Sequence, residues 1–500
     1  MKKRYSFLAT ALVAATFVGS EAAAQTEGDT PPTVFLTEAQ IRQATLVGNH
    51  DLKALAARIR QGEAVARGVA GGFGPTLRGE ASLSQDNRQP LNSFQPSGVE
   101  SRRLGLSVVQ PLTSGISLSG GVTLDRTRLS QSEPPNAALP YPETFYQPRL
   151  FVAADVDLLR DLHGFISQRR LVKADHDAEG IRGRRGNVTA RLLAAASTLL
   201  WNIRALDEIT QTTGAFLDDL ERLEKEVAHK VDRSLAEPGD LYQLKALIGM
   251  RRASLVTIDR HRRSLAEGIA SFVGSDGPVR VAPQATLAEG EAGIKACEAS
   301  IMKTPTFSPA LSSVYGAYEA DIAAADIERD ILEREILPDL SLVGSYATNG
   351  TDTSLDGSVT ETAGTSRNEY YLGLRLSLPL SHDRERSKKG IGEAVAALGR
   401  SAYAKRLDDD RALFDSYRDR IGSIGEEIEL VKNAVVNGQR QLKDLRLRYR
   451  QGRVPLYQLV SEEADVLQFH LRLKELVAER IALVHGFAGR FDRIACGEKE

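Results

Sequence analysis

Leu241-Tyr242-Gln243-Leu244 and Leu456-Tyr457-Gln458-Leu459 are identical segments that stand 215 residues apart in a chain of 500. Each follows a Pro/Gly break that ends a long helical pattern. The same order of elements surrounds both copies: a helical stretch, strand-like segments, a long helix, a tip and a returning helix. Because this order is duplicated along with the four residues, the sequence predicts an internally duplicated, elongated protein rather than a globular enzyme.

The helix before the second copy has the most regular pattern in the chain. Alternating four- and three-residue spacings, sustained for more than four heptads, are typical of a coiled-coil seam. A continuous helix over 386–450 would be roughly 100 Å long, about three times the thickness of a bilayer's hydrocarbon core. The residues of this seam are Tyr417, Ile421, Ile424, Ile428, Val431, Val435, Gly438, Leu442, Leu445 and Tyr449. Repeat 1 keeps the spacing at Leu192, Ala196, Leu199, Ile203 and Leu206, and resumes it after a phase change near Ile209 at Phe216, Leu220, Leu223 and Val227.

Strand-like alternation occupies the other end of each repeat. In the clearest segment, six apolar residues from Tyr370 to Leu380 share one side, and Arg375 with small polar groups takes the other. This pattern fits a strand with lipid outside and water inside. The alternative is a soluble amphipathic strand packed on its own core. We favour the lipid-facing strand, because long helices flank each strand cluster and cannot cover it.

The first 24 residues read as a signal peptide. Lys2-Lys3-Arg4 form a basic region, an apolar stretch follows, and Ala22-Ala23-Ala24 form a small-residue cleavage site without a following cysteine for a lipid anchor. The chain is therefore expected to be exported. After the signal peptide at 1–24, we predict repeat 1 at 25–273, with a helix from Thr37, strands about 75–158, a long helix about 160–235 and a returning helix 240–273. A connector of little regular structure, whose prolines are Pro278, Pro283 and Pro305, follows at 274–308. Repeat 2 is predicted at 309–491, with a helix, strands about 338–347 and 369–380, a long helix about 386–451 and a returning helix 455–488, and a tail at 492–500 follows it.

The composition and motifs exclude several functions. A formal net charge of -2 gives no support for nucleic-acid binding, which needs a basic face. No 18 consecutive apolar residues occur in the mature chain, so no membrane-spanning helix is expected. The histidines are scattered singly, and HExxH and CxxC motifs are absent. Asp408-Asp409-Asp410 read as helix-surface charges. We therefore expect no catalytic site, no cofactor and no metal site.

Cys297 and Cys496 are the two cysteines of the chain. In an oxidising compartment they could form a disulfide that ties the two ends of repeat 2 together. The alternative is a pair of free thiols in flexible segments. The sequence does not decide between them, because it does not fix the distance between the two residues.

Over nearly the whole mature chain, the sequence resembles the TolC-like outer-membrane efflux proteins. The resemblance rests on several loose motifs that occur together, in order and in duplicate. These are Asn49-His50-Asp51-Leu52, Val109-Gln110-Pro111-Leu112, Trp201 early in a long helix, Pro338-Asp339-Leu340-Ser341, and Arg448-Tyr449-Arg450-Gln451-Gly452 with the second Leu-Tyr-Gln-Leu segment.

The resemblance implies an α+β membrane protein and a homotrimer. Each chain would give strands, usually four, to one shared outer-membrane β-barrel and long coiled-coil hairpins to a periplasmic tunnel. Repeat 1 has up to four strand candidates, so a surplus hairpin at the barrel rim or outside the cell is one interpretation. The sequence does not show which two of these four strands span the membrane.

The resemblance also places closure of the tunnel and contact with a periplasmic adaptor at the hairpin tips. By motif, the tips are Glu237, Pro238, Gly239 and Asp240 in repeat 1, and Gly452, Arg453, Val454 and Pro455 in repeat 2. Relatives often carry acidic rings near the second tip, where this chain has Gln458 and Ser461. Glu462, Glu463 and Asp465 could supply the charge instead, although a solvated helix face is the alternative for each.

The expected function is an exit duct of a tripartite efflux or type I secretion system, recruited by a periplasmic adaptor and an inner-membrane pump. The expected location is the outer membrane, with the helical part in the periplasm. The alternative is a periplasmic coiled-coil adaptor without a channel of its own. Adaptors carry one helical hairpin flanked by lipoyl-like strands, whereas this chain has two hairpins and an outward-facing Leu/Tyr strand. The cargo is not readable from the sequence.

Overall fold

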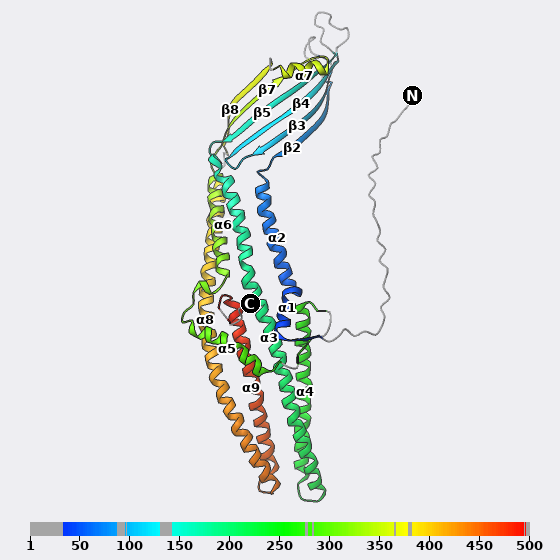
Figure 1. Ribbon diagram of the computed structural model, residues 1–500, viewed down its shortest axis with the longest axis vertical. Coiled ribbons are helices and arrows are strands. Elements are labelled where there is room, and N and C mark those ends of the chain that lie inside the picture. The colour runs from blue at the N-terminus through cyan, green and yellow to red at the C-terminus, as the bar shows by residue number, and fades with distance from the viewer. Residues whose placement is uncertain are drawn as a thin grey trace, which may run out of the picture.

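The computed structural model describes residues 34–87, 96, 98–130, 143–275, 279–282, 285–364, 367–378, 383–494 and 496. The predicted signal peptide lies outside these residues. Figure 1 shows an elongated molecule with a sheet at one end and long helices that run away from it. Among the described helices, none combines the length and apolar character that crossing a bilayer requires. The predicted α+β class, with two long helical hairpins and a group of strands, is confirmed.

One antiparallel sheet contains the strands of both repeats, in the order β2-β3-β4-β5-β7-β8. Repeat 1 contributes β2 (Thr76–Asp86), β3 (Gly98–Pro111), β4 (Ile116–Ser130) and β5 (Thr144–Asp157). Repeat 2 contributes β7 (Asp339–Asn349) and β8 (Asn368–Ser377). All four strands of repeat 1 are paired along most of their length, so within the described residues no two of them form a separate surplus hairpin. The part of the chain that the structure describes supplies six strands to this sheet, where the resemblance implies four.

The register aligns the alternation of all six strands, so the sheet has one apolar and one polar face. One apolar row runs Gly79, Leu106, Val122, Leu150 and Thr348, and the neighbouring rows add mainly leucine and valine. Leu372, Leu374 and Leu376 of β8 share this face and are 65–73% exposed. On the polar face, Arg103 of β3 pairs with Asp125 of the neighbouring β4 at 2.7 Å. Two further ion pairs reach across β7 from β5 to β8: Arg149–Glu369 at 3.3 Å and Arg375–Asp155 at 3.4 Å.

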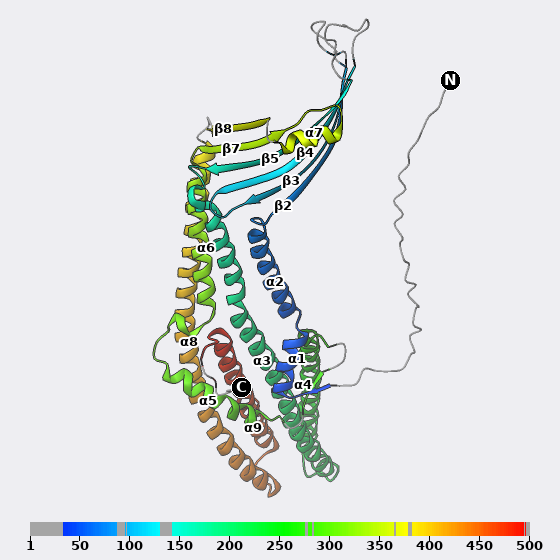
Figure 2. The same cartoon turned by 45° about the horizontal axis from the view of Figure 1, so that its top comes forward.

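Two helical hairpins extend from the sheet. The first is α3 (Phe165–Asp232) with α4 (Pro238–Val273), and the second is α8 (Asp383–Arg450) with α9 (Leu456–Arg490). The outgoing helices α3 and α8 each contain 68 residues, which makes each roughly 100 Å long at 1.5 Å per residue. Figures 1 and 2 show that both hairpins end at the same extremity, far from the sheet.

Shorter helices lead into each set of strands. In repeat 1 these are α1 (Glu38–Gly48) and α2 (His50–Gly71), and in repeat 2 the helix is α6 (Val314–Glu335). The predicted continuous helix from Thr37 is broken at Asn49. Asn49 caps α2 by accepting hydrogen bonds from the backbone of Asp51 and Leu52, while its amide donates to Phe272 O at 2.8 Å. The Asn-His-Asp-Leu motif therefore ends one helix and begins the next.

The connector at 274–308 is more ordered than predicted. It contains β6 (Val279–Val281), which pairs in parallel with β1 (Val34–Leu36), and α5 (Leu287–Lys303). Thr286 and Glu289 form a capping box at the start of α5, and Leu287, Ile294 and Ile301 bury its inner face. The prolines that suggest an irregular connector lie outside this helix, so the prediction was wrong. The segment between β7 and β8 also contains a helix, α7 (Leu355–Ala363).

The predicted seams lie in the core of the hairpins. In α8, Ile421, Ile428 and Leu442 are buried, and a Cβ on Gly438 would meet Val466 Cγ2 at 2.9 Å. In α3, Thr213 is also buried in the seam. Because threonine is polar, a search for apolar residues does not show that the seam of α3 continues through this position.

Two further features tie the helices together. Cys297 of α5 and Cys496 after α9 form a disulfide. Asp410 was predicted to be a surface charge, and that prediction was wrong. It is fully buried in α8, where its carboxylate accepts hydrogen bonds from Tyr315, Arg406 and Arg490 at 2.6–2.8 Å. It thereby connects α6, α8 and α9.

Candidate functional site at the helix tips

The tip of the second hairpin is the five-residue connection 451–455. Gly452 takes a positive φ of +67°, which glycine tolerates without the clash that a Cβ would cause. Arg453 N donates to Arg448 O at 2.9 Å and Gly452 N donates to Tyr449 O at 3.0 Å, so the end of α8 is capped by backbone. Pro455 has extended backbone and is the N-cap of α9. All four residues predicted for this tip lie in the connection.

The tip of the first hairpin lies slightly earlier than predicted. The connection is 233–237, and Ser234, with φ +60°, takes a left-handed conformation that glycine adopts more easily. Glu237 is the N-cap of α4, and Pro238 begins that helix, as its fixed φ favours. Gly239 and Asp240 belong to the first turn of α4 rather than to the turn itself. The glycine therefore does not form the tip.

The two Leu-Tyr-Gln-Leu segments occupy equivalent places at the start of the returning helices. Their leucines point into a common apolar cluster, in which Leu244, Leu456 and Leu459 are at most 2% exposed. Their tyrosines, Tyr242 and Tyr457, are 69% and 62% exposed. The cluster contains residues of α3, α4, α8 and α9, so the two hairpins pack against each other at the tips.

The predicted gate-lining residues share one side of α9. Gln458, Ser461, Glu462 and Asp465 follow helical spacing, and all but Glu462 are exposed. Glu462 is half-buried and accepts a hydrogen bond from Gln441 Nε2 at 2.7 Å. Burial, and then the carboxylate of Asp465, raise the pKa of Glu462. This side of the helix faces away from the apolar cluster and offers polar groups.

An ionic contact between the hairpins, absent from the sequence-based predictions, lies beside the apolar cluster. Arg446 Nη2 of α8 lies 2.7 Å from Asp219 Oδ2 of α3 and 2.8 Å from Glu463 Oε1 of α9. Glu463 is 4% exposed, so the solvated helix face considered for it was wrong. We call Arg446, Asp219 and Glu463 the tip clamp. Its members are far apart in the chain, and no local pattern identifies them.

Burial controls the protonation of this clamp. Burial raises the pKa of Glu463 and outweighs the lowering effect of the Arg446 guanidinium. Its Oε2 atom has no hydrogen-bond partner among the described residues. Asp219 also pairs with Arg222 on its own helix. The two partners therefore differ in burial: Arg446 is partly exposed, and its charge compensates the unfavourable burial of the Glu463 carboxylate.

Among the described residues, no group of three or more histidine, cysteine, aspartate or glutamate side chains could hold a metal ion. The tips contain carboxylates, amides and aromatic groups at their surface, an arrangement suited to contacts with another protein.

The sequence matches no protein-family model. It matches no curated protein sequence either. Solved structures of outer-membrane channels do share its architecture.

The chain is similar to CusC, described in a study of transmembrane channel formation, with a TM-score of 0.66 and 13% identity over 93% of this chain and 95% of CusC. The outer membrane protein VceC from Vibrio cholerae gives a TM-score of 0.63 and 14% identity over 91% and 95% of the two chains. The MtrE outer membrane channel of Neisseria gonorrhoeae, in its open state, gives 0.61 and 12% identity over 91% and 88%. Because each comparison covers most of both chains, the chain has the fold of the TolC-like outer-membrane channels that its motifs resemble.

Proposed function

We propose that this protein is the outer-membrane exit duct of an efflux or type I secretion system. The observation that carries the proposal is the two-faced sheet. Its leucine- and valine-rich face is exposed in the single chain, and its opposite face carries ion pairs and small polar residues. An apolar outer face and a polar inner face are what a strand needs between lipid and a water-filled channel.

The sheet also favours a closed oligomer. β2 and β8 are the outer strands, and within the described residues each pairs with a neighbour on one side only. Unpaired strand edges are costly in lipid, so we propose that β8 of one chain pairs with β2 of the next in a homotrimer. Three chains of six strands would form a barrel of eighteen strands, a size that leaves an aqueous channel in porins.

The helical hairpins would then form a periplasmic tunnel that ends at the tips. We propose that the tip clamp and the apolar cluster hold the tips closed, and that an adaptor docks on the exposed tip residues and opens the passage. The inner-membrane pump would supply energy and select the cargo. The role is passive conduction rather than catalysis. The adaptor-only alternative is not favoured, because two hairpins and a six-stranded sheet exceed what an adaptor needs.

The experiment is fractionation followed by reconstitution. We expect the detergent-solubilised protein to come from the outer membrane, to run unheated as a trimer in gel filtration, and to conduct ions in a planar bilayer. Recovery as a soluble periplasmic monomer would overturn the proposal. A membrane-bound trimer without any conductance, even after release of the tips by the variants below, would overturn the channel role alone.

Substitution of the second tip tests where the gate lies. In Gly452→Ala with Pro455→Ala, the left-handed backbone at position 452 becomes unfavourable by about 1 kcal/mol. We expect altered closure or weaker adaptor crosslinking, with trimer assembly intact. Gly239→Ala is the matched control, since that residue is helical and a Cβ there meets open space. If transport, drug sensitivity and adaptor crosslinking were all unchanged in the double variant, the gate and the adaptor contact would not lie at this tip.

A further inference from the structure

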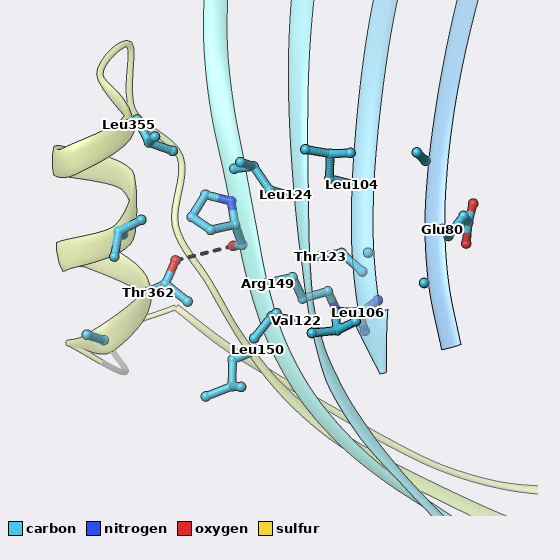
Figure 3. Close-up of a pocket in the computed structure, with 16 residues that line it drawn as sticks. Glu80, Leu104, Leu106, Val122, Thr123, Leu124, Arg149, Leu150, Leu355 and Thr362 are labelled. Atoms are coloured by element: carbon cyan, nitrogen blue, oxygen red, sulfur yellow. Dashed lines mark hydrogen bonds between the residues drawn. The ribbon is translucent and has the colours of Figure 1, made fainter. Parts of the chain in front are cut away.

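The helix between β7 and β8 is firmly anchored by its polar side. Ser354 caps α7 by accepting from Gly357 N at 3.2 Å, and Thr362 Oγ1 donates to Pro148 O at 3.2 Å. Ser358 is fully buried, with its carbonyl close to Gly350. Figure 3 shows the contact between Thr362 and the carbonyl of β5. α7 is therefore held in a defined position over the sheet.

The other side of α7 is apolar and overhangs the apolar face of the sheet. Leu355 and Val359 remain 46% and 49% exposed. Between them and the leucines of β3, β4 and β5 lies a groove of about 680 Å³. Leu104, Leu124 and Leu150 line its floor (Figure 3). We call this space the α7 groove.

The chemistry of the α7 groove suits a hydrocarbon chain. Its volume falls within the roughly 300–1,000 Å³ of ligand sites in proteins. Water would find few partners there, because an ordered water needs two to four polar groups. The groove is continuous with the exposed apolar face of the sheet, so an acyl chain in a surrounding membrane could enter it from the side.

Basic residues lie just beyond the groove on the same face. Arg102 of β3 and Arg126 of β4 are paired across the two strands. They lie two residues beyond the Leu104 and Leu124 pair on each strand, a distance of about 7 Å along the strands. Arg128 lies two residues further along β4, where it is paired with Glu100 of β3. Arg102 pairs with Glu100 at 2.7 Å, and Arg126 lies over the Tyr146 ring at 5.9 Å. Three arginines against Glu100 and Asp352, which is bridged to Tyr146 in the same row, leave this rim with a net positive charge.

We propose that the α7 groove and the arginine rim together bind an anionic membrane lipid. An acyl chain would lie beneath Leu355 and Val359, and the phosphate would contact Arg102 and Arg126 through charge-assisted hydrogen bonds. The inference rests on the proposed function, because it requires this sheet face to meet lipid. α7 lies at the end of the sheet far from the helices (Figure 1), so the lipid would belong to the outer leaflet.

Lipid retention by the purified, full-length protein tests the proposal. The probes are phosphatidylglycerol and phosphatidylcholine in mixed micelles, with retained lipid counted by native mass spectrometry. We expect phosphatidylglycerol to be retained in preference to phosphatidylcholine. Arg102→Gln with Arg126→Gln should weaken phosphatidylglycerol retention about tenfold or more, as loss of hydrogen bonds to a charged group predicts. Val359→Trp, which fills the groove, should reduce retention of both lipids.

Two matched controls keep the test specific. Arg78→Gln removes a cation from the polar face of β2, and Leu374→Trp adds bulk to the apolar face of β8 away from the groove. Both should retain phosphatidylglycerol as the unaltered chain does. Every variant is first shown to run as the assembled species in unheated gel filtration. Phosphatidylglycerol retention that is unchanged in the arginine and Val359 variants would overturn the inference.

Free phosphate separates a lipid site from a simple anion site. Inorganic phosphate at the same concentration should displace little phosphatidylglycerol, because it leaves the acyl chain in place. Full displacement by phosphate would overturn the lipid assignment. A protein that conducts from the outer membrane but retains no lipid would contradict this inference alone. A soluble monomer would contradict the proposed function as well.

Discussion

At the scale of single residues, Arg446 shows how an ion pair with a buried carboxylate can hold two parts of a molecule together. It contacts Asp219 of α3 and Glu463 of α9, and Glu463 is almost fully buried. The arginine is one-third exposed, so the contact can be broken without unfolding the core. These properties suit the proposed gate, in which the contact would be stable at rest and would break during opening.

Arg446→Gln should therefore destabilise the tips more than a surface substitution does. Losing one partner of a fully buried pair costs roughly 3–5 kcal/mol, and we expect about 2 kcal/mol here because Arg446 is partly solvated. Thermal melting followed by circular dichroism would measure the loss, and planar bilayers should show higher basal conductance. Arg448→Gln is the control, since that residue makes an exposed pair with Asp444.

A second substitution separates the two causes of that loss. In Arg446→Gln with Glu463→Gln, no uncompensated carboxylate remains buried, so most of the stability should return. Conductance should stay high, because the link to Asp219 is still missing. A double variant that is less stable than Arg446→Gln alone would contradict this account of the clamp.

Glu208 makes the stability of the middle of the molecule depend on pH. It accepts hydrogen bonds from Leu287 N at the start of α5 and from Lys474 of α9, both at 2.8 Å. Burial alone would raise the pKa of Glu208, but these two contacts lower it below its ordinary value of 4.5. A lowered pKa in the folded state means that the stabilisation is complete above 4.5 and is lost as the pH falls through the folded-state pKa.

Glu208→Gln should consequently lower the melting temperature at neutral pH, by an amount corresponding to about 2 kcal/mol. The difference from the unaltered protein should shrink as the pH is taken below 4.5. Glu479→Gln removes an exposed partner of Arg420 and should have little effect at any pH. A Glu208→Gln deficit that grows in acid would contradict the sign of this linkage.

At the scale of elements, the hairpins depend on close approach between α8 and α9. Gly438 allows this approach, since a Cβ there would meet Val466 Cγ2 at 2.9 Å and Phe469 at 3.4 Å. Val466 is fully buried and stiff about its first side-chain torsion, so it cannot move aside easily. Gly425 of the same helix has open space in the same position.

The two glycines should respond in opposite ways to alanine. Gly425→Ala should stabilise the protein by up to about 1 kcal/mol through helix propensity. Gly438→Ala should lose that gain and become destabilising, because the new methyl group forces the helices apart. Melting temperatures of the two variants measure the difference directly. Equal stabilisation by both would show that the α8–α9 contact is looser than the structure indicates.

At the scale of the whole molecule, the number of strands would set the width of the proposed channel. Barrel diameter grows roughly linearly with strand number, so a trimer with six strands per chain would be about one and a half times as wide as one with four. Electron microscopy of the purified trimer would show this, and larger neutral polymers should enter the pore. An image with twelve strands would contradict the proposed closure.

Much of the architecture can be predicted because it is encoded by local periodicity. The seam from Tyr417 to Tyr449 specifies a long helix, and the alternation in β8 specifies a two-faced strand. The tip at Gly452 also follows from local residue types. The first tip does not, since Ser234 rather than Gly239 takes the left-handed position. There the backbone caps the end of α3, with Leu235 N donating to Lys230 O at 2.7 Å, and no glycine marks the position in the sequence.

The sequence by itself determined the duplication, the two hairpins and the amphipathic character of the strands, because each follows from the spacing of neighbouring residues. Only the tertiary structure decided that all six strands join one sheet, that Asp410 is buried, and that Arg446 reaches Asp219. It also created the α7 groove from residues of both repeats. These features join residues that are distant in the chain, and such contacts depend on chain topology and side-chain packing rather than on local periodicity.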